Sequence, residues 1–143
     1  MKYKLLFLSA ILLLIIESGC LKHTDPVTPL IPSGTFSGKF TMLHRKTDNV
    51  PYDTVKANLV ITLQTPAYTY AVTGDTSKHA GSYGTFGINS NYIKFTDKTY
   101  PATGIPAKMH LAGVYGYIYD GSVFQIYAAS SDTLGVLYDL KKN

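Results

Sequence analysis

The side chains that could carry chemistry are few and widely spaced along this chain of 143 residues. The histidines are His23, His44, His79 and His110, and none forms a His-x-His pair or stands at a spacing typical of zinc ligands. We therefore expect them to be solvated residues of loops and strands. The sequence predicts neither a metal centre nor another cofactor.

Acid–base hydrolysis needs carboxylates in two different environments, whereas the acidic residues here resemble turn formers. Glu17 is the only glutamate, and most aspartates stand at expected turns: Asp48, Asp75, Asp97, Asp120 and Asp132. The sequence has no Gly-x-Ser-x-Gly elbow and no glycine-rich phosphate loop leading into a helix. We expect a protein that is not an enzyme. An envelope hydrolase, with a Ser-His-Asp set assembled only by the fold, is the less favoured alternative.

A row of tyrosines is the feature that most favours binding. Tyr115, Tyr117 and Tyr119 occupy alternate positions, so in a strand they share one face, and Tyr127 would lie nearby on the paired strand. A tyrosine combines a large apolar ring with a hydroxyl, which suits the lining of a cavity or the grip on a sugar or peptide. The alternative is cross-strand packing that stabilises a sheet without disulfides.

Cys20 is the only cysteine, and it ends a segment with the features of an export signal. Lys2 and Lys4 precede an apolar run of 12 residues, Leu5 to Ile16, which is followed by Glu17-Ser18-Gly19-Cys20. About 20 apolar residues are needed to cross a membrane, so the run favours a cleaved signal over a transmembrane anchor. A single cysteine also excludes an internal disulfide.

This segment resembles the lipobox of bacterial lipoproteins, with Glu17 where that motif usually has an apolar residue and the Bacteroidota type tolerating such variation. The resemblance implies cleavage before Cys20, acyl chains such as palmitate on its thiol, and essentially permanent attachment to a membrane. Leu21 in the next position favours the outer membrane and leaves open which side. An ordinary secretory signal is the alternative.

On this basis the chain divides into a lipoprotein signal peptide, a lipidated tether and a folded domain, at residues 1–19, 20–33 and 34–143. Pro26, Pro29 and Pro32 favour an extended polyproline II spacer for the tether. The formal net charge of +4 is spread over single lysines, which is typical of a soluble surface and not of a nucleic-acid site.

The domain has an all-β pattern. β-branched and aromatic residues alternate with polar ones between frequent Gly, Asn, Asp and Pro residues, most clearly in Val55 to Gln64. Turns are expected at Asn89-Ser90-Asn91 and, as type I′, at Asp120-Gly121. We predict eight strands, the sixth bending at Gly113, near residues 35–45, 53–64, 67–73, 81–88, 92–97, 107–119, 122–129 and 133–141.

Strands joined in sequence by short turns imply an up-and-down meander that closes into a barrel, with a two-sheet β-sandwich as the alternative. The meander, the opening Gly34-Thr35-Phe36 where lipocalins have Gly-x-Trp, and the closing Leu134 to Leu140 together resemble small lipocalin-like, or calycin-type, barrels of Gram-negative lipoproteins. This resemblance implies a fold, and no ligand or binding residue is carried over from it.

These observations predict a lipid-anchored, noncatalytic envelope lipoprotein without a nucleic-acid partner. Its barrel is expected to bind a small apolar or amphipathic ligand, or a protein or glycan partner, through Tyr115, Tyr117, Tyr119 and Tyr127. A cavity lined by the first three rings would favour a small ligand. The Pro- and Gly-rich loop 98–108 is expected to border the barrel mouth. A structural or inhibitory lipoprotein with a solid core is the alternative.

Overall fold

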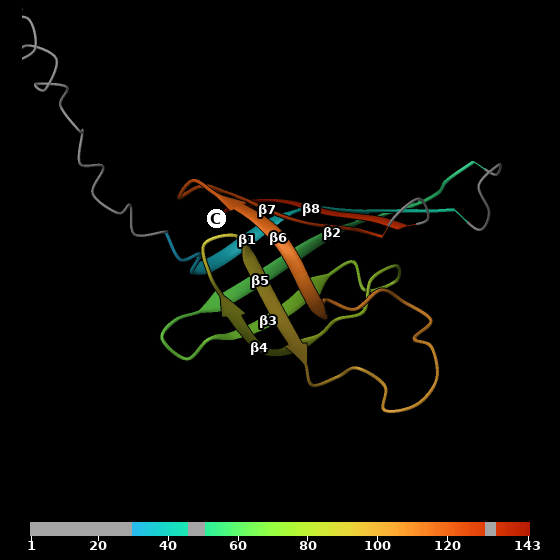
Figure 1. The fold of residues 1–143 in the computed structure, drawn as a ribbon, viewed down its shortest axis with the longest axis horizontal. Helices are drawn as coiled ribbons and strands as arrows, with labels where there is room; N and C mark the ends of the chain where they lie inside the picture. Colours follow the sequence, from blue (N-terminus) through green and yellow to red (C-terminus); the bar gives the residue numbers. More distant parts are fainter. Residues whose placement is uncertain (1–29, 46–50, 131–133) are drawn as a thin grey trace, which may run out of the picture.

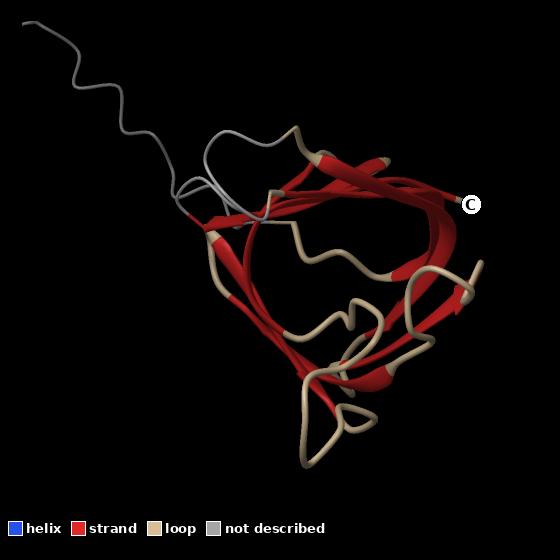
Figure 2. Ribbon diagram, turned by 90° about the vertical axis from the view of Figure 1, so that its right-hand side faces the viewer, coloured by secondary structure: helices blue, strands red, loops and turns tan. Residues whose placement is uncertain are grey.

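The structure is a computed structural model that describes residues 30–45, 51–130 and 134–143. Within these ranges the chain forms eight antiparallel strands, which are β1 (Gly34–His44), β2 (Asp53–Gln64), β3 (Thr69–Gly74), β4 (Tyr83–Ile88), β5 (Tyr92–Asp97), β6 (Gly113–Tyr119), β7 (Val123–Ser130) and β8 (Leu134–Lys142). Each strand pairs with the next and β8 pairs with β1, so the sheet is a closed barrel (Figures 1 and 2). The predicted barrel is confirmed, and the sandwich alternative is wrong.

Some of the sequence predictions fall outside the described residues. These are Cys20, the signal segment and most of the tether, together with the expected turns at Asp48 and Asp132. Among the residues that are described, no helix is long and apolar enough to span a membrane.

Alternation of apolar and polar residues explains why the strands form and which face they bury. On β2 the buried side chains are Ala57, Leu59, Ile61 and Leu63. Lys56 and Asn58, on the opposite face of the strand, are exposed. Full burial of a leucine-sized side chain contributes about 1.5–3 kcal/mol, so this register is strongly preferred over one shifted by a single residue.

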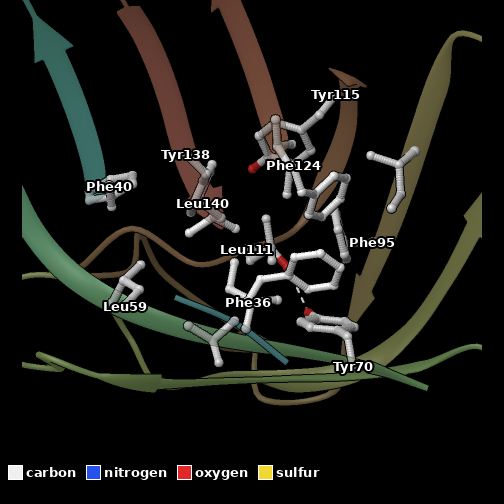
Figure 3. Packing of buried hydrophobic residues seen from close by; sticks show 14 of the residues in the cluster. Phe36, Phe40, Leu59, Tyr70, Phe95, Leu111, Tyr115, Phe124, Tyr138 and Leu140 are labelled. Atoms are coloured by element: carbon white, nitrogen blue, oxygen red, sulfur yellow. Dashed lines mark hydrogen bonds between the residues drawn. The ribbon is translucent and has the colours of Figure 1, made fainter. Parts of the chain in front are cut away.

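Aromatic rings from several strands fill the barrel (Figure 3). The ring centroid of Phe36 lies 5.2 Å from that of Phe124, and the ring centroid of Phe40 lies 5.0 Å from that of Tyr138. Aromatic pairs at such distances stabilise a core by about 0.5–1.5 kcal/mol beyond the burial of their area. The barrel is therefore held together by a packed aromatic core.

The connections at the two ends of the barrel differ in length (Figure 1). We call the end where β1 begins the tether end, and it carries the short turns 65–68, 89–91 and 120–122 together with Asn143. We call the opposite end the loop end, and its described connections include the longer segments 75–82 and 98–112. Any site built from loops is therefore expected at the loop end.

The sixth strand is shorter than the sequence predicts. β6 begins only at Gly113, whose φ of 103° lies in the left-handed region, and residues 107–112 belong to the preceding loop. In that loop Leu111 is fully buried, and its carbonyl oxygen accepts a hydrogen bond of 2.6 Å from the Tyr70 hydroxyl (Figure 3). The alternating pattern of Met109 and Leu111 thus reflects a loop that folds into the barrel end instead of a longer strand.

Both predicted turns are present, although the one at Asp120 is centred one residue later than expected. The N–H of Asp120 donates to the carbonyl oxygen of Val123 at 3.3 Å, so Gly121 and Ser122 are the central residues. Gly121 has a φ of 101°, whereas Asp120 does not have the positive φ that a type I′ turn would need there. Glycine at the first central position is characteristic of a type II′ turn.

Candidate functional site

The row of Tyr115, Tyr117 and Tyr119 faces the barrel interior and contributes to the core. The ring centroid of Tyr115, a residue that is 3% exposed, lies 6.0 Å from that of Phe95. The ring centroids of Tyr117 and Tyr119 lie 6.3 and 5.9 Å from that of Phe124. Burial raises the pKa of the Tyr115 hydroxyl, which stays neutral and donates to a backbone carbonyl. These contacts match the packing alternative weighed for the row.

Tyr127 lies on the outer face of the barrel, away from the other three tyrosines. Tyr127 is 48% exposed. Its ring lies so close over Gly116 that a Cβ on Gly116 would be 2.5 Å from the ring Cζ. Gly116 pairs with Tyr92 on one side and with Tyr127 on the other. We call the exposed large hydrophobic residues of this region the outer patch: Tyr92, Val114, Ile118, Tyr127 and Leu137.

His79 is fully buried at the loop end, so the expectation of a solvated histidine is wrong here. Its Nδ1 lies 2.7 Å from the carbonyl oxygen of Ala80 and must donate, since that oxygen has no proton to give. Its Nε2 lies 3.0 Å from the hydroxyl of Tyr138 and accepts. Burial lowers the pKa of His79 to about 4, so the ring is neutral near pH 7 and serves as a structural anchor. No spacing in the sequence signals this role.

Asp97 forms a turn, as predicted, and in addition holds His110. One carboxylate oxygen accepts hydrogen bonds of 2.7 Å from both the backbone N–H and the hydroxyl of Thr99. The other lies 2.7 Å from Nδ1 of His110. The Asp97 side chain is fully buried and that of His110 is 11% exposed. The expectation of a solvated His110 is therefore wrong as well, because a buried carboxylate fixes its ring.

A groove opens at the loop end, and we call it the distal groove. Its volume is about 430 Å³, within the range of small-molecule sites. Its apolar lining includes Met42 from β1, Leu134 from β8, and Ile105 and Met109 from the loop 98–112, and Ile105 is 96% exposed. The loop 98–108 borders this opening, as expected from its composition.

The ionisable side chains that line the distal groove, apart from the Tyr100 phenol, are His44, Lys108 and His110. Lys108 Nζ donates to the carbonyl oxygen of Thr76 at 2.7 Å, which ties the loop 98–112 to the loop 75–82. Among the described residues the lining contains no carboxylate, serine or cysteine, and no group of three or more potential metal ligands gathers anywhere in these ranges. This arrangement suits binding better than nucleophilic or metal chemistry.

No protein-family model, curated protein or solved structure matches this chain. The eight-stranded antiparallel closed barrel is compatible with a lipocalin-like fold.

Proposed function

We propose that the protein is a noncatalytic binding module, held at the outer membrane by acyl chains on Cys20, and that it takes a small amphipathic ligand in the distal groove. The observation that carries this proposal is the groove itself. Ile105, at 96% exposed, extends an apolar surface into water beside Met42 and Leu134. Covering such a side chain with a ligand lowers the free energy of the complex by about 25 cal/mol per Å² of apolar area removed from water.

The polarity of the barrel fits a lipid-anchored receptor. The first strand begins at Gly34 at the tether end of the barrel, and the distal groove lies at the loop end. Ser33 accepts a hydrogen bond of 2.9 Å from the hydroxyl of Thr65, which holds Ser33 at the tether end. An anchor at Cys20 would join the domain at the end opposite the groove, which would leave the groove open to ligands from the aqueous phase.

Displacement of a fluorescent fatty-acid analogue tests the binding proposal. We expect saturable binding that Ile105→Asp weakens roughly 10-fold, since a charge replaces an apolar contact. Ile118→Asp is the matched control, because Ile118 is also exposed, at 57%, but lies on the outer patch. Absence of saturable binding, or equal losses in both variants, would overturn the proposal.

Mass spectrometry of the mature N-terminus tests the anchor. We expect a chain that begins at Cys20 and carries acyl chains, and we expect Cys20→Ala to leave the membrane fraction. An unmodified Cys20, or an intact segment before it, would show that the lipoprotein interpretation is wrong.

A second candidate function, the binding of a glycan, is favoured by the outer patch. The Tyr127 ring lies against Gly116, and the residue is exposed to solvent. On the other side of Gly116, its partner on β5 is the exposed Tyr92. Aromatic faces of this kind suit stacking against sugar rings. Loss of glycan binding in Tyr127→Ser, with groove binding retained, would support this function, and an unchanged glycan signal would exclude it.

A further inference from the structure

We infer that the ligand of the distal groove carries a carboxylate and that His110 recognises it through Nε2. This inference rests on the proposed function and specifies the class of ligand. It is drawn from the pairing of His110 with Asp97 and from the charges around the groove.

The position of His110 leaves one ring nitrogen available. Nδ1 faces the Asp97 carboxylate at 2.7 Å, and Asp97 is itself fixed by two hydrogen bonds from Thr99. Nε2 has no hydrogen-bond partner within the described parts of the chain, and His110 is one of the residues that line the groove. A histidine held in this way is oriented before any ligand arrives, because the carboxylate sets both the tautomer and the plane of the ring.

The charge on the Asp97–His110 pair determines which ligand fits. A proton on Nε2 makes the ring a cation that Asp97 balances, and Nε2–H then becomes a charge-assisted donor aimed at an anion. An acidic ligand brings the charge that stabilises this state. Asp97 therefore acts as a positioning residue, and His110 makes the contact.

Apart from the paired Asp97, the described groups around His110 on the surrounding elements carry no negative charge. Asp97 at the end of β5 is buried and already paired, and the Tyr100 ring centroid lies 5.3 Å from the imidazole in an edge contact. His44 at the end of β1 and Lys108 in the loop line the same groove, and His79 lies behind the loop as a neutral ring. A carboxylate entering the groove thus meets cationic or neutral groups, whereas an ammonium group would meet unfavourable ones.

The apolar lining accounts for the rest of the ligand. Met42 and Met109 have flexible, unbranched side chains and Leu134 has a branched one, and all three line the groove together with His110. A volume of about 430 Å³ accommodates a medium-length alkyl chain with its headgroup. Octanoate is therefore a suitable probe, with octanol and octylammonium as partners of equal chain length.

Calorimetric titration of the full-length protein in phospholipid nanodiscs, with empty nanodiscs as the blank, tests the inference. We expect octanoate to bind about 10-fold more tightly than octanol, and octylammonium to bind most weakly. His110→Gln should remove the preference for octanoate, so that octanoate and octanol then bind with similar affinity. Asp97→Asn should reduce the preference by removing the balancing charge. Lys94→Gln, which removes an exposed cation on β5 outside the groove, should change neither affinity.

The outcomes separate the inference from the function on which it rests. Equal affinities for octanoate and octanol would overturn recognition of an acid while leaving a ligand-binding groove in place. No saturable binding of any of the three probes would overturn the proposed function itself. A preference for octanoate that survives in His110→Gln would assign the recognition to another residue and show that the role given to His110 is wrong.

Discussion

Nε2 of His79 accepts a hydrogen bond of 3.0 Å from the hydroxyl of Tyr138, which joins the loop 75–82 to the barrel wall. The ring of His79 also packs edge-on against Phe40, at 4.8 Å between centroids. A residue of the loop 75–82 is thus part of the core and closes the interior of the barrel at the loop end. Because the histidine is buried in its neutral form, the stability of this closure depends on pH.

Stability is expected to fall as the solution becomes acidic through the range in which an unfolded histidine takes up a proton. The pKa of His79 is about 4 in the folded protein against 6.5 for a free histidine. The unfolded state therefore binds more protons between these values, and the free energy of unfolding decreases as pH falls through the window. The loss between pH 7 and pH 5 should be about 2 kcal/mol, measured by urea denaturation.

This range lies above the pH at which most carboxylates titrate, so the effect of His79 can be isolated. His79→Gln should flatten the slope, whereas His44→Gln, which removes an exposed histidine, should retain it. A wild-type stability that is constant from pH 7 to pH 5 would contradict the buried neutral assignment.

Tyr138→Phe tests the hydrogen bond from the other side. The change keeps the ring and removes only the hydroxyl, so the buried Nε2 of His79 loses its donor. We expect a loss of about 1–3 kcal/mol in the free energy of unfolding. Tyr119→Phe is the control, because its hydroxyl donates to the carbonyl oxygen of Gly121 in an exposed position, and it should cost about 0.5 kcal/mol or less. Similar losses in the two variants would show that the Tyr138 hydroxyl has no special role.

Gly38→Ala is expected to weaken the pairing that closes the barrel. A Cβ at Gly38 would lie 2.1 Å from the backbone oxygen of Asp139 on β8, and backbone cannot swing away as a side chain does. We expect a loss of at least about 2 kcal/mol in thermal or urea unfolding. Gly87→Ala on β4, where a Cβ would meet nothing within 4 Å, should be neutral or slightly stabilising. A neutral Gly38→Ala would show that β1 and β8 are not so closely paired.

Gly116→Ala should displace the Tyr127 ring from the outer face with little effect on the core. A Cβ there would collide with the end of the tyrosine side chain, 2.5 Å from its Cζ, and this ring can move. We expect a modest loss of stability, about 1 kcal/mol. In a double-mutant cycle, the same change in a Tyr127→Ala background should cost clearly less. Additive losses would mean that the ring does not lie over the glycine.

The sequence was sufficient to predict the strands because alternation follows directly from burial on one face. Val55 to Gln64 and the closing strand show this pattern most clearly, and their boundaries differ from prediction by a residue or less. Closure of the barrel followed from the order of the strands and their short turns. These are local features, and local features are what a single sequence displays.

The candidate site could not be predicted in the same way, because it depends on contacts between loops. Asp97 and His110 are 13 positions apart and meet only because residues 107–112 fold back over the barrel end. The pattern at Met109 and Leu111 correctly indicated inward side chains but could not distinguish a strand from a loop. The buried His79 left no pattern, since its partner Tyr138 is 59 positions away.

The last residue of the domain lies beside the first strand, where the N–H of Asn143 donates to the carbonyl oxygen of Thr35 at 2.9 Å. A short linker between Asn143 and Gly34 would therefore suffice to make the chain circular without changing which strands are neighbours. New ends could then be opened in the exposed segment 101–104 at the loop end. A tether joined to the new N-terminus of such a permuted protein would leave the barrel at the loop end, beside the distal groove and not opposite it.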